Sequence, residues 1–176
     1  MRKLKTEEIT RITTDEFHEA EKIPLVVVLD NVRSLLNLGS VFRTCDAYRV
    51  EELILCGITA TPPNNEIHKS ALGAEYSVRW SYCEETLDAV ARLHNDGYIV
   101  ASVEQATDSV MLNTFQIDKG KKYAVILGNE VKGVQQSVID ASDLCLELPQ
   151  FGTKHSLNVS VTAGIVIWEM AKNMIL

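Results

Sequence analysis

The stretch Leu25-Val26-Val27-Val28-Leu29, followed by Asp30-Asn31, decides the fold class of this chain. It is a continuous apolar run rich in β-branched residues, which is typical of a strand buried on both faces of a parallel sheet. Similar runs predict further strands at residues 53–56, 98–103, 123–127 and 144–148. Helical patterns separate or follow these runs at residues 39–49, 84–96, 134–141 and 156–174. This alternation predicts an α/β domain with a mostly parallel sheet flanked by helices.

The composition fits one ordinary globular domain. The chain has 176 residues, of which 46% are hydrophobic and 23% are charged, and this is enough to bury a core. We expect residues 1–23 to form a short polar N-terminal extension and residues 24–176 to form the domain. The sequence has no apolar run of roughly 18 residues and no apolar signal core at its start, so we expect a cytoplasmic protein without a membrane span.

The charge balance and the cysteines exclude some classes of function. A net charge of −7 argues against a general nucleic-acid coat, which needs lysine and arginine to neutralise phosphates, but it leaves room for a local basic patch. The four cysteines form no CxxC pair, and the histidines do not cluster at ligand spacing. We therefore expect no metal site.

Familiar nucleotide and hydrolase motifs are missing from the sequence. No GxGxxG fingerprint follows any predicted strand, which argues against a dinucleotide site. Gly128 and Gly133 have the glycine spacing of a P-loop, but Val134 and Gln135 follow where that loop needs Lys and Ser or Thr. There is also no GxSxG nucleophile elbow. ATP hydrolysis and serine-hydrolase chemistry are therefore disfavoured.

Three polar, glycine-bearing or asparagine-bearing stretches follow apolar runs far apart in the chain. In an open parallel sheet, ligands bind outside the carboxyl ends of the strands, so polar residues at these ends suggest one composite site. The stretches are Asn31-Val32-Arg33-Ser34-Leu35-Leu36-Asn37-Leu38-Gly39-Ser40-Val41-Phe42-Arg43, Leu127-Gly128-Asn129-Glu130-Val131-Lys132-Gly133 and Ser156-Leu157-Asn158-Val159-Ser160.

Taken together and in this order, the three stretches resemble the motifs of the SpoU/TrmH family within the SPOUT class of RNA methyltransferases. The resemblance covers the chain from about Pro24 to its C-terminus. It implies transfer of a methyl group from S-adenosylmethionine to a ribose 2′-hydroxyl of tRNA or rRNA. It also implies a C-terminal trefoil knot and a homodimer with the active site at the subunit interface. A homodimer would account for a last helix that is apolar nearly all round, because such a helix must be buried.

The resemblance implies a catalytic set of Arg43, Asn37, Glu130, Ser156 and Asn158. A guanidinium is too weak an acid to act readily as a base, so we expect Arg43 to grip the phosphate beside the target ribose. Glu130 would be a charge partner that positions Arg43 or a substrate group. Asn37 would orient Arg43 or the ribose, although a helix N-cap is an equally open interpretation. Ser156 and Asn158 would face the ribose and phosphate, but both are also suited to cap the last helix.

The same resemblance places the cofactor against Val103, Gly128, Leu148 and Leu157, largely through backbone groups. A glycine at such a position lets the backbone approach a ligand closely. Basic residues in or near the motif loops would form a local RNA-binding surface, or would be ordinary solvated charges. These residues are Arg33, Arg49, Lys69, Lys132, Lys154 and His155.

Two alternatives stay open at this point. One is a non-catalytic RNA-binding or assembly protein on the same fold, although a pure binder has no need of the catalytic set. The other is a methyltransferase that acts on a base, which an analogy of fold does not exclude. The sequence names neither the RNA nor the nucleotide.

Overall fold

The computed structural model describes residues 1–175 and contains a seven-stranded sheet in the order β3-β2-β1-β6-β4-β7-β5. Every pair of neighbouring strands is parallel, as the buried apolar runs predict. The strands are β1 (Ile23–Asp30), β2 (Val50–Cys56), β3 (Trp80–Cys83), β4 (Tyr98–Val103), β5 (Val110–Met111), β6 (Lys122–Leu127) and β7 (Leu144–Glu147).

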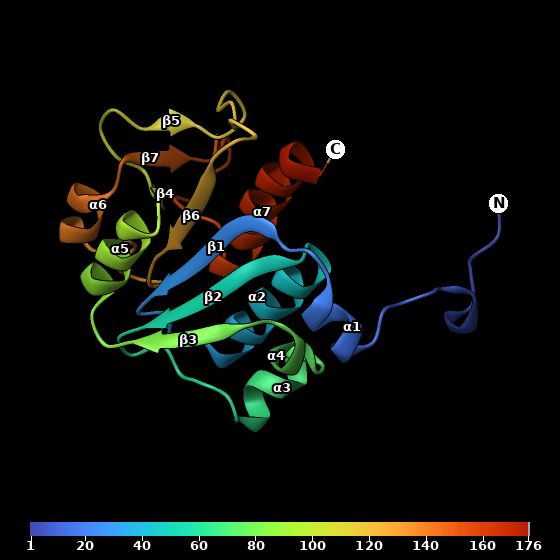
Figure 1. Cartoon of the computed structure of the whole chain (residues 1–176). Helices are drawn as coiled ribbons and strands as arrows, with labels where there is room; N and C mark the ends of the chain where they lie inside the picture. Colours follow the sequence, from blue (N-terminus) through green and yellow to red (C-terminus); the bar gives the residue numbers. More distant parts are fainter. Residues whose placement is uncertain (176) are drawn as a thin grey trace.

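Helices cover both faces of the sheet (Figure 1). They are α1 (Thr14–Glu19), α2 (Leu35–Ala47), α3 (Asn65–Ala71), α4 (Ala74–Ser77), α5 (Thr86–Asn95), α6 (Gln136–Ala141) and α7 (Val159–Ile175), preceded by a 3₁₀ turn η1 (Thr6–Glu8). Along β1, Leu25, Val27 and Leu29 pack in the larger core with α2 and α7, while Val26 and Val28 pack in the smaller core with α5 and α6. This alternation is the period of two that a strand imposes on its side chains.

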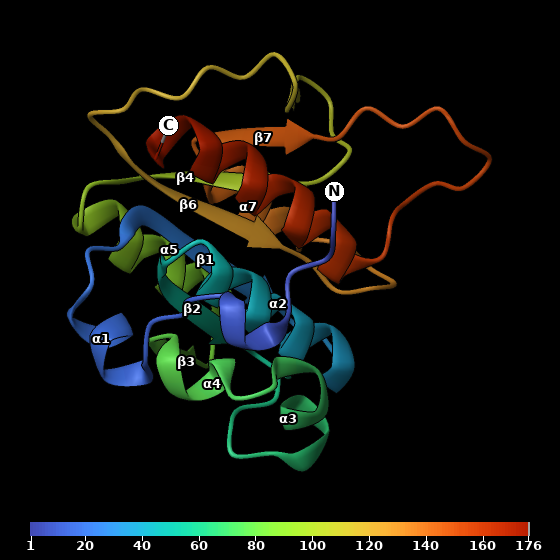
Figure 2. The same cartoon turned by 90° about the vertical axis from the view of Figure 1, so that its right-hand side faces the viewer.

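The strand order brings the three motifs to one edge. The chain runs from β1 outward through β2 and β3, and then returns to the other side of β1, where β6 inserts between β1 and β4. In this register Leu127 at the end of β6 lies beside both Leu29 and Val103. Figure 2 shows the segment between β7 and α7 looping out beyond the end of β7 before α7 begins. The loops after β1, β4, β6 and β7 therefore gather at the carboxyl edge, where α/β sheets bind ligands.

Several predicted boundaries are wrong. α2 begins at Leu35 rather than at residue 39, because the side chain of Ser34 accepts a hydrogen bond from the amide of Asn37 and caps the helix. α7 begins at Val159 rather than at residue 156. The strand at residues 98–103 is confirmed.

The sequence analysis missed five short elements. These are η1, α3, α4, β3 and β5, which span between two and seven residues. Elements of this length carry too few residues to establish a periodic pattern. Within residues 1–175, no helix has both the length and the apolar composition needed to cross a membrane.

Candidate active site

The loop after β6 lies against the start of α2. Glu130 accepts hydrogen bonds from the amide of Arg33 (Oε2, 3.0 Å) and from the amide of Ser34 (Oε1, 2.9 Å). These amides belong to the helix cap and to the residue before it. Amides at a helix start have no partner within the helix, and its dipole favours negative charge there. Glu130 therefore ties the second motif to the first.

Asn37 links all three motifs. Its Nδ2 donates a hydrogen bond to Glu130 Oε1 (3.2 Å), and its Oδ1 accepts one from Asn158 Nδ2 (3.1 Å). Ser160 Oγ also donates to Asn37 Oδ1 (3.4 Å) and to Asn158 Oδ1 (2.6 Å). Because both ends of its amide are engaged, the side chain of Asn37 has one preferred orientation. The expectation that Asn37 is the helix N-cap is wrong, since Ser34 has that position.

The hydrogen bonds keep Glu130 ionised. Burial raises the pKa of this carboxyl, but the bonds from the amides of Arg33 and Ser34 and from the Asn37 side chain outweigh burial. The net pKa of Glu130 therefore lies below its ordinary value. A carboxylate with a lowered pKa is a poor proton acceptor at neutral pH, so this geometry favours a positioning role over general-base chemistry.

The two predicted catalytic residues of the third motif, Ser156 and Asn158, lie differently. Asn158 Oδ1 accepts a hydrogen bond from the amide of Ser160 (2.9 Å), which is the bond of a helix N-cap, so the capping interpretation is confirmed for Asn158. Ser156 lies two residues before this cap in the exposed loop, so the capping alternative is wrong for Ser156. Both residues line the same cavity.

The second motif folds as a tight loop. The amides and carbonyls of Asn129 and Gly133 exchange two hydrogen bonds (3.0 and 2.9 Å). A Cβ on Gly128 would lie 2.1 Å from backbone atoms of Gly133 and Val134, so only glycine fits. Asn129 Nδ2 donates to the carbonyl of Asn31 (2.7 Å), which holds the loop against the end of β1.

A buried carboxylate fixes the end of this loop. Asp30 is fully buried at the end of β1. Its Oδ1 accepts hydrogen bonds from Thr86 Oγ1 (2.7 Å), Gln135 Nε2 (2.9 Å) and Asn31 Nδ2 (2.8 Å). Its Oδ2 accepts a hydrogen bond from the amide of Gln135 (3.0 Å). These bonds satisfy the buried charge and connect β1, the start of α5 and the start of α6.

A cavity of about 1040 Å³ opens beside this network. Its size suits a ligand larger than a single nucleoside. All four predicted cofactor residues line it, together with three of the five predicted catalytic residues. The first group is Val103, Gly128, Leu148 and Leu157, and the second is Glu130, Ser156 and Asn158.

The cavity lining is acidic. Glu104, Glu130, Asp140 and Glu147 line it, whereas Lys132 is its one basic residue in the described part of the chain. Opposite charges attract most strongly where water is partly excluded. The arrangement therefore favours a ligand with a positive charge.

Arg43 does not join this network within the chain. It lies on the exposed side of α2 and lines a separate cavity. The expected pairing of Glu130 with Arg43 is wrong within one chain, because residues 33, 34 and 37 occupy the carboxylate instead. The sequence could not show this, since it does not state which side of α2 faces the loop after β6.

Two residues of the site received no role from the sequence. Glu104 Oε2 accepts a hydrogen bond from the amide of Val134 (3.1 Å), and this carboxylate occupies the space that a side chain at Gly133 would need. Ser160 joins Asn37 to Asn158. The position of Glu104 after an apolar strand was a usable signal, since the other site residues share it.

The predicted basic surface is divided. Lys132 lines the main cavity and Arg49 lines the second one, while Arg33 is exposed beside the network. Lys69 forms an exposed ion pair with Glu66 (2.5 Å), which contributes little to stability.

Comparison with known proteins gives consistent matches. The model of the SpoU rRNA Methylase family matches residues 24–168. A tRNA (guanosine(18)-2′-O)-methyltransferase of Aquifex aeolicus is 30% identical over 157 residues, which cover 88% of this chain and 72% of that protein.

Solved structures agree with this match. The crystal structure of the A. aeolicus TrmH/SpoU tRNA modifying enzyme superposes with a TM-score of 0.78 at 25% identity, covering 91% of this chain and 79% of that one. An AdoMet-bound rRNA methyltransferase from Sinorhizobium meliloti superposes with a TM-score of 0.79 at 28% identity. That match covers 96% of this chain, which spans 63% of the S. meliloti chain.

Proposed function

Because the chain belongs to the SpoU rRNA methylase family, we propose that it transfers a methyl group from S-adenosylmethionine to a ribose 2′-hydroxyl of tRNA or rRNA. The observation that carries this proposal is the hydrogen-bonded chain from Glu130 through Asn37 to Asn158, at the mouth of an acidic cavity. It joins three motifs that are remote in sequence, and its members are polar groups suited to orienting a ribose and a phosphate.

The cavity fits S-adenosylmethionine. Val103, Leu148 and Leu157 supply apolar walls, and the bare backbone at Gly128 permits close approach. The carboxylates of Glu104 and Glu130 would favour the positive charge of a sulfonium. When bound, the cofactor supplies a methyl group on a positively charged sulfur, which is a good leaving group.

The protein's own residues would position the nucleophile. We assign Ser156 and Asn158 to the ribose and its phosphate, with Asn37 holding Asn158 in place. Arg43 would bind the neighbouring phosphate with paired hydrogen bonds, and the phosphate would assist removal of the hydroxyl proton. Glu130 would hold the start of α2 rather than act as the base.

A second copy of the chain would complete the site. Val161, Ile165 and Trp168 on α7 are between 41% and 50% exposed, and α7 lies beside α2 (Figure 2). An exposed apolar stripe of this kind favours a protein partner. A homodimer through this face would place the active site at the subunit interface, with Arg43 supplied across it. We also propose a cytoplasmic location, where tRNA and ribosomes are found.

We also propose that the C-terminal part of the chain forms a trefoil knot. The family resemblance supports this knot, which would be formed by the segment that leads into α7. We retain residues 1–23 as an N-terminal extension, although Phe17 is buried in the core, and residues 24–176 as the methyltransferase domain.

Methyl transfer with labelled S-adenosylmethionine tests the proposal. The protein is incubated with tRNA and rRNA from a strain that lacks its gene, and the RNA is digested to nucleosides. Label in a 2′-O-methyl nucleoside is the expected result. Label on a base would instead identify a base methyltransferase, and RNA binding without transfer would identify a non-catalytic binder. Arg43→Lys should lose most turnover while it still binds S-adenosylhomocysteine.

A further inference from the structure

A second cavity, of about 750 Å³, lies away from the acidic one. The N-terminal segment at residues 10–14 forms one wall, the second half of α2 forms another, and the turn between α3 and α4 forms the third. Arg11, Arg43 and Arg49 all line it, and we call it the arginine cavity.

The charge of the arginine cavity is unusual for this protein. Three arginines line it against a single carboxylate, Asp46, although the whole chain has a net charge of −7. Asp46 Oδ1 accepts a hydrogen bond from Ser77 Oγ (2.5 Å). Among residues 1–175, none of the three arginines forms an ion pair. Unpaired guanidiniums around a concave surface favour an anionic ligand.

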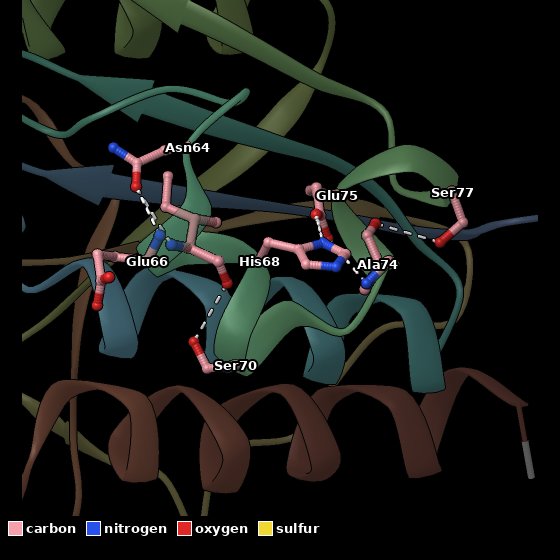
Figure 3. Close-up of polar contacts among 9 residues, drawn as sticks. Asn64, Glu66, His68, Ser70, Ala74, Glu75 and Ser77 are labelled. Atoms are coloured by element: carbon pink, nitrogen blue, oxygen red, sulfur yellow. Dashed lines mark hydrogen bonds and ion pairs between the residues drawn. The ribbon is translucent and has the colours of Figure 1, made fainter.

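The carboxylate of Glu75, on α4, does not line the arginine cavity, and Figure 3 shows it turned toward His68. Glu75 pairs with His68 Nδ1 (2.5 Å), and its other oxygen accepts a hydrogen bond from the amide of Gly73 (3.0 Å). The wall that remains consists of Ala71, Leu72, Gly73, Ala74 and Ser77. Apart from Asp46, which accepts the hydrogen bond from Ser77 Oγ, this side of the arginine cavity presents no negative charge to a phosphate oxygen.

Arg49 occupies a backbone conformation that arginine seldom adopts. Its φ angle is 51°, in the left-handed region where glycine or asparagine is more easily accommodated. The strand start depends on this turn, because the carbonyl of Arg49 accepts a hydrogen bond from the amide of Ile23 (3.0 Å). An arginine at such a position costs stability, so it points to a use for the side chain.

The two cavities are complementary in charge. The acidic cavity suits a positively charged cofactor but repels a polyanion, so an RNA that enters it must be held elsewhere by its backbone. We propose that the arginine cavity binds backbone phosphates of the substrate RNA, and that residues 10–14 complete it by supplying Arg11. This inference rests on the proposed function, because it takes RNA as the ligand.

Salt-dependent binding of unfractionated tRNA tests this inference. Arg11→Gln and Arg49→Gln are compared with the wild type and with Lys121→Gln, which removes the same charge from an exposed loop outside both cavities. Each arginine variant should weaken binding about fivefold to tenfold near 0.1 M salt and lower the slope of log K against log salt by about 0.7 to 0.9. Arg11→Lys should retain most of the slope, because it keeps the charge.

A second readout separates this inference from the proposed function. All variants should bind S-adenosylhomocysteine like the wild type and melt at a similar temperature, since the arginine cavity is separate from the acidic one. If the salt-dependence slopes of Arg11→Gln and Arg49→Gln equal that of Lys121→Gln, RNA binding by the arginine cavity is overturned. The proposed methyl transfer is unaffected by that result. Arginine-dependent RNA binding without any methyl transfer would overturn the proposed function instead.

Discussion

Glu130 Oε1 and Asn37 Nδ2 lie 3.2 Å apart, although 93 positions separate the two residues. The contact joins the loop after β6 to the first turn of α2. The Asn37 side chain donates one hydrogen bond to the carboxylate of Glu130 and accepts another from Asn158. The polar edge of the site is therefore one connected structure rather than a set of independent side chains, and its parts should fail together.

Replacing Asn37 should separate catalysis from cofactor binding. Asn37→Ala removes the link between Glu130 and Asn158, although Asn37 itself does not line the acidic cavity. We expect turnover to fall about 10²-fold, because small misplacements of reacting groups are costly. Affinity for S-adenosylhomocysteine should stay unchanged by calorimetry. Ser40→Ala on the same helix, outside the network, is the control. Equal turnover in both variants would argue against the network.

Gly128→Ala should damage the acidic cavity. The new Cβ would lie 2.1 Å from backbone atoms of Gly133 and Val134, so the loop must move. We expect the affinity for S-adenosylhomocysteine, measured by calorimetric titration, to fall at least about tenfold, which corresponds to about 1.4 kcal/mol. Gly120→Ala, where the nearest atom lies at an ordinary 3.4 Å, should bind like the wild type. A Gly128→Ala protein with full affinity would remove this loop from the cofactor site.

Asp30→Asn should destabilise the fold. The carboxylate of Asp30 accepts bonds from Thr86 and twice from Gln135, and an amide would turn an N–H toward at least one of these donors. An unsatisfied buried group costs about 1–3 kcal/mol, so the midpoint of urea unfolding should shift downward. Asp88→Asn, at an exposed position on α5, should leave the midpoint nearly unchanged. Identical midpoints would show that Asp30 is not a structural anchor.

The buried carboxyl of Glu75 predicts a pH-dependent stability. Burial raises its pKa, but the bonds from His68 and from the amide of Gly73 outweigh burial and leave the pKa lowered from 4.5. A lowered pKa stabilises the protein above the pKa of the unfolded chain, and this contribution disappears as pH falls through the folded pKa. Glu75→Gln should therefore cost about 1–3 kcal/mol at about pH 6 and clearly less at about pH 3.5.

Urea unfolding of the Glu75→Gln variant and the wild type at both pH values gives this difference. Glu66→Gln is the matched control, because Glu66 lies on α3 in an exposed ion pair with Lys69 and should contribute less than about 1 kcal/mol. A cost of Glu75→Gln that is the same at both pH values would contradict the assignment.

Ile165→Glu should disrupt the proposed dimer. Ile165 is 41% exposed on α7, and Leu87 is 43% exposed on α5, which covers the other face of the sheet. A charge at residue 165 should convert a dimer to a monomer in sedimentation experiments and abolish turnover, because a buried unpaired charge is costly. Leu87→Glu should remain dimeric and active. A dimeric Ile165→Glu protein would place the interface elsewhere.

The sequence by itself determined the α/β class, the parallel sheet and the strand positions that carry the motifs. A continuous apolar, β-branched run such as residues 25–29 indicates a strand that is buried on both faces. This can be predicted from the sequence because the run consists of consecutive residues. The family resemblance of the sequence motifs also pointed to the lining of the acidic cavity, and Val103, Gly128 and Leu148 each lie at or beside the carboxyl end of a strand. Ligands bind at these ends whatever the strand order.

Only the tertiary structure decided which polar groups meet. Glu130 contacts Ser34 and Asn37 rather than Arg43, because β6 inserts beside β1 and brings its loop to the start of α2. Arg43 lies farther along that helix and joins Arg11 and Arg49 in a second cavity. Hydrogen bonds that span 93 to 121 positions depend on strand order and helix rotation. No local pattern encodes either of them, so the partners of these residues became visible only once the chain had folded.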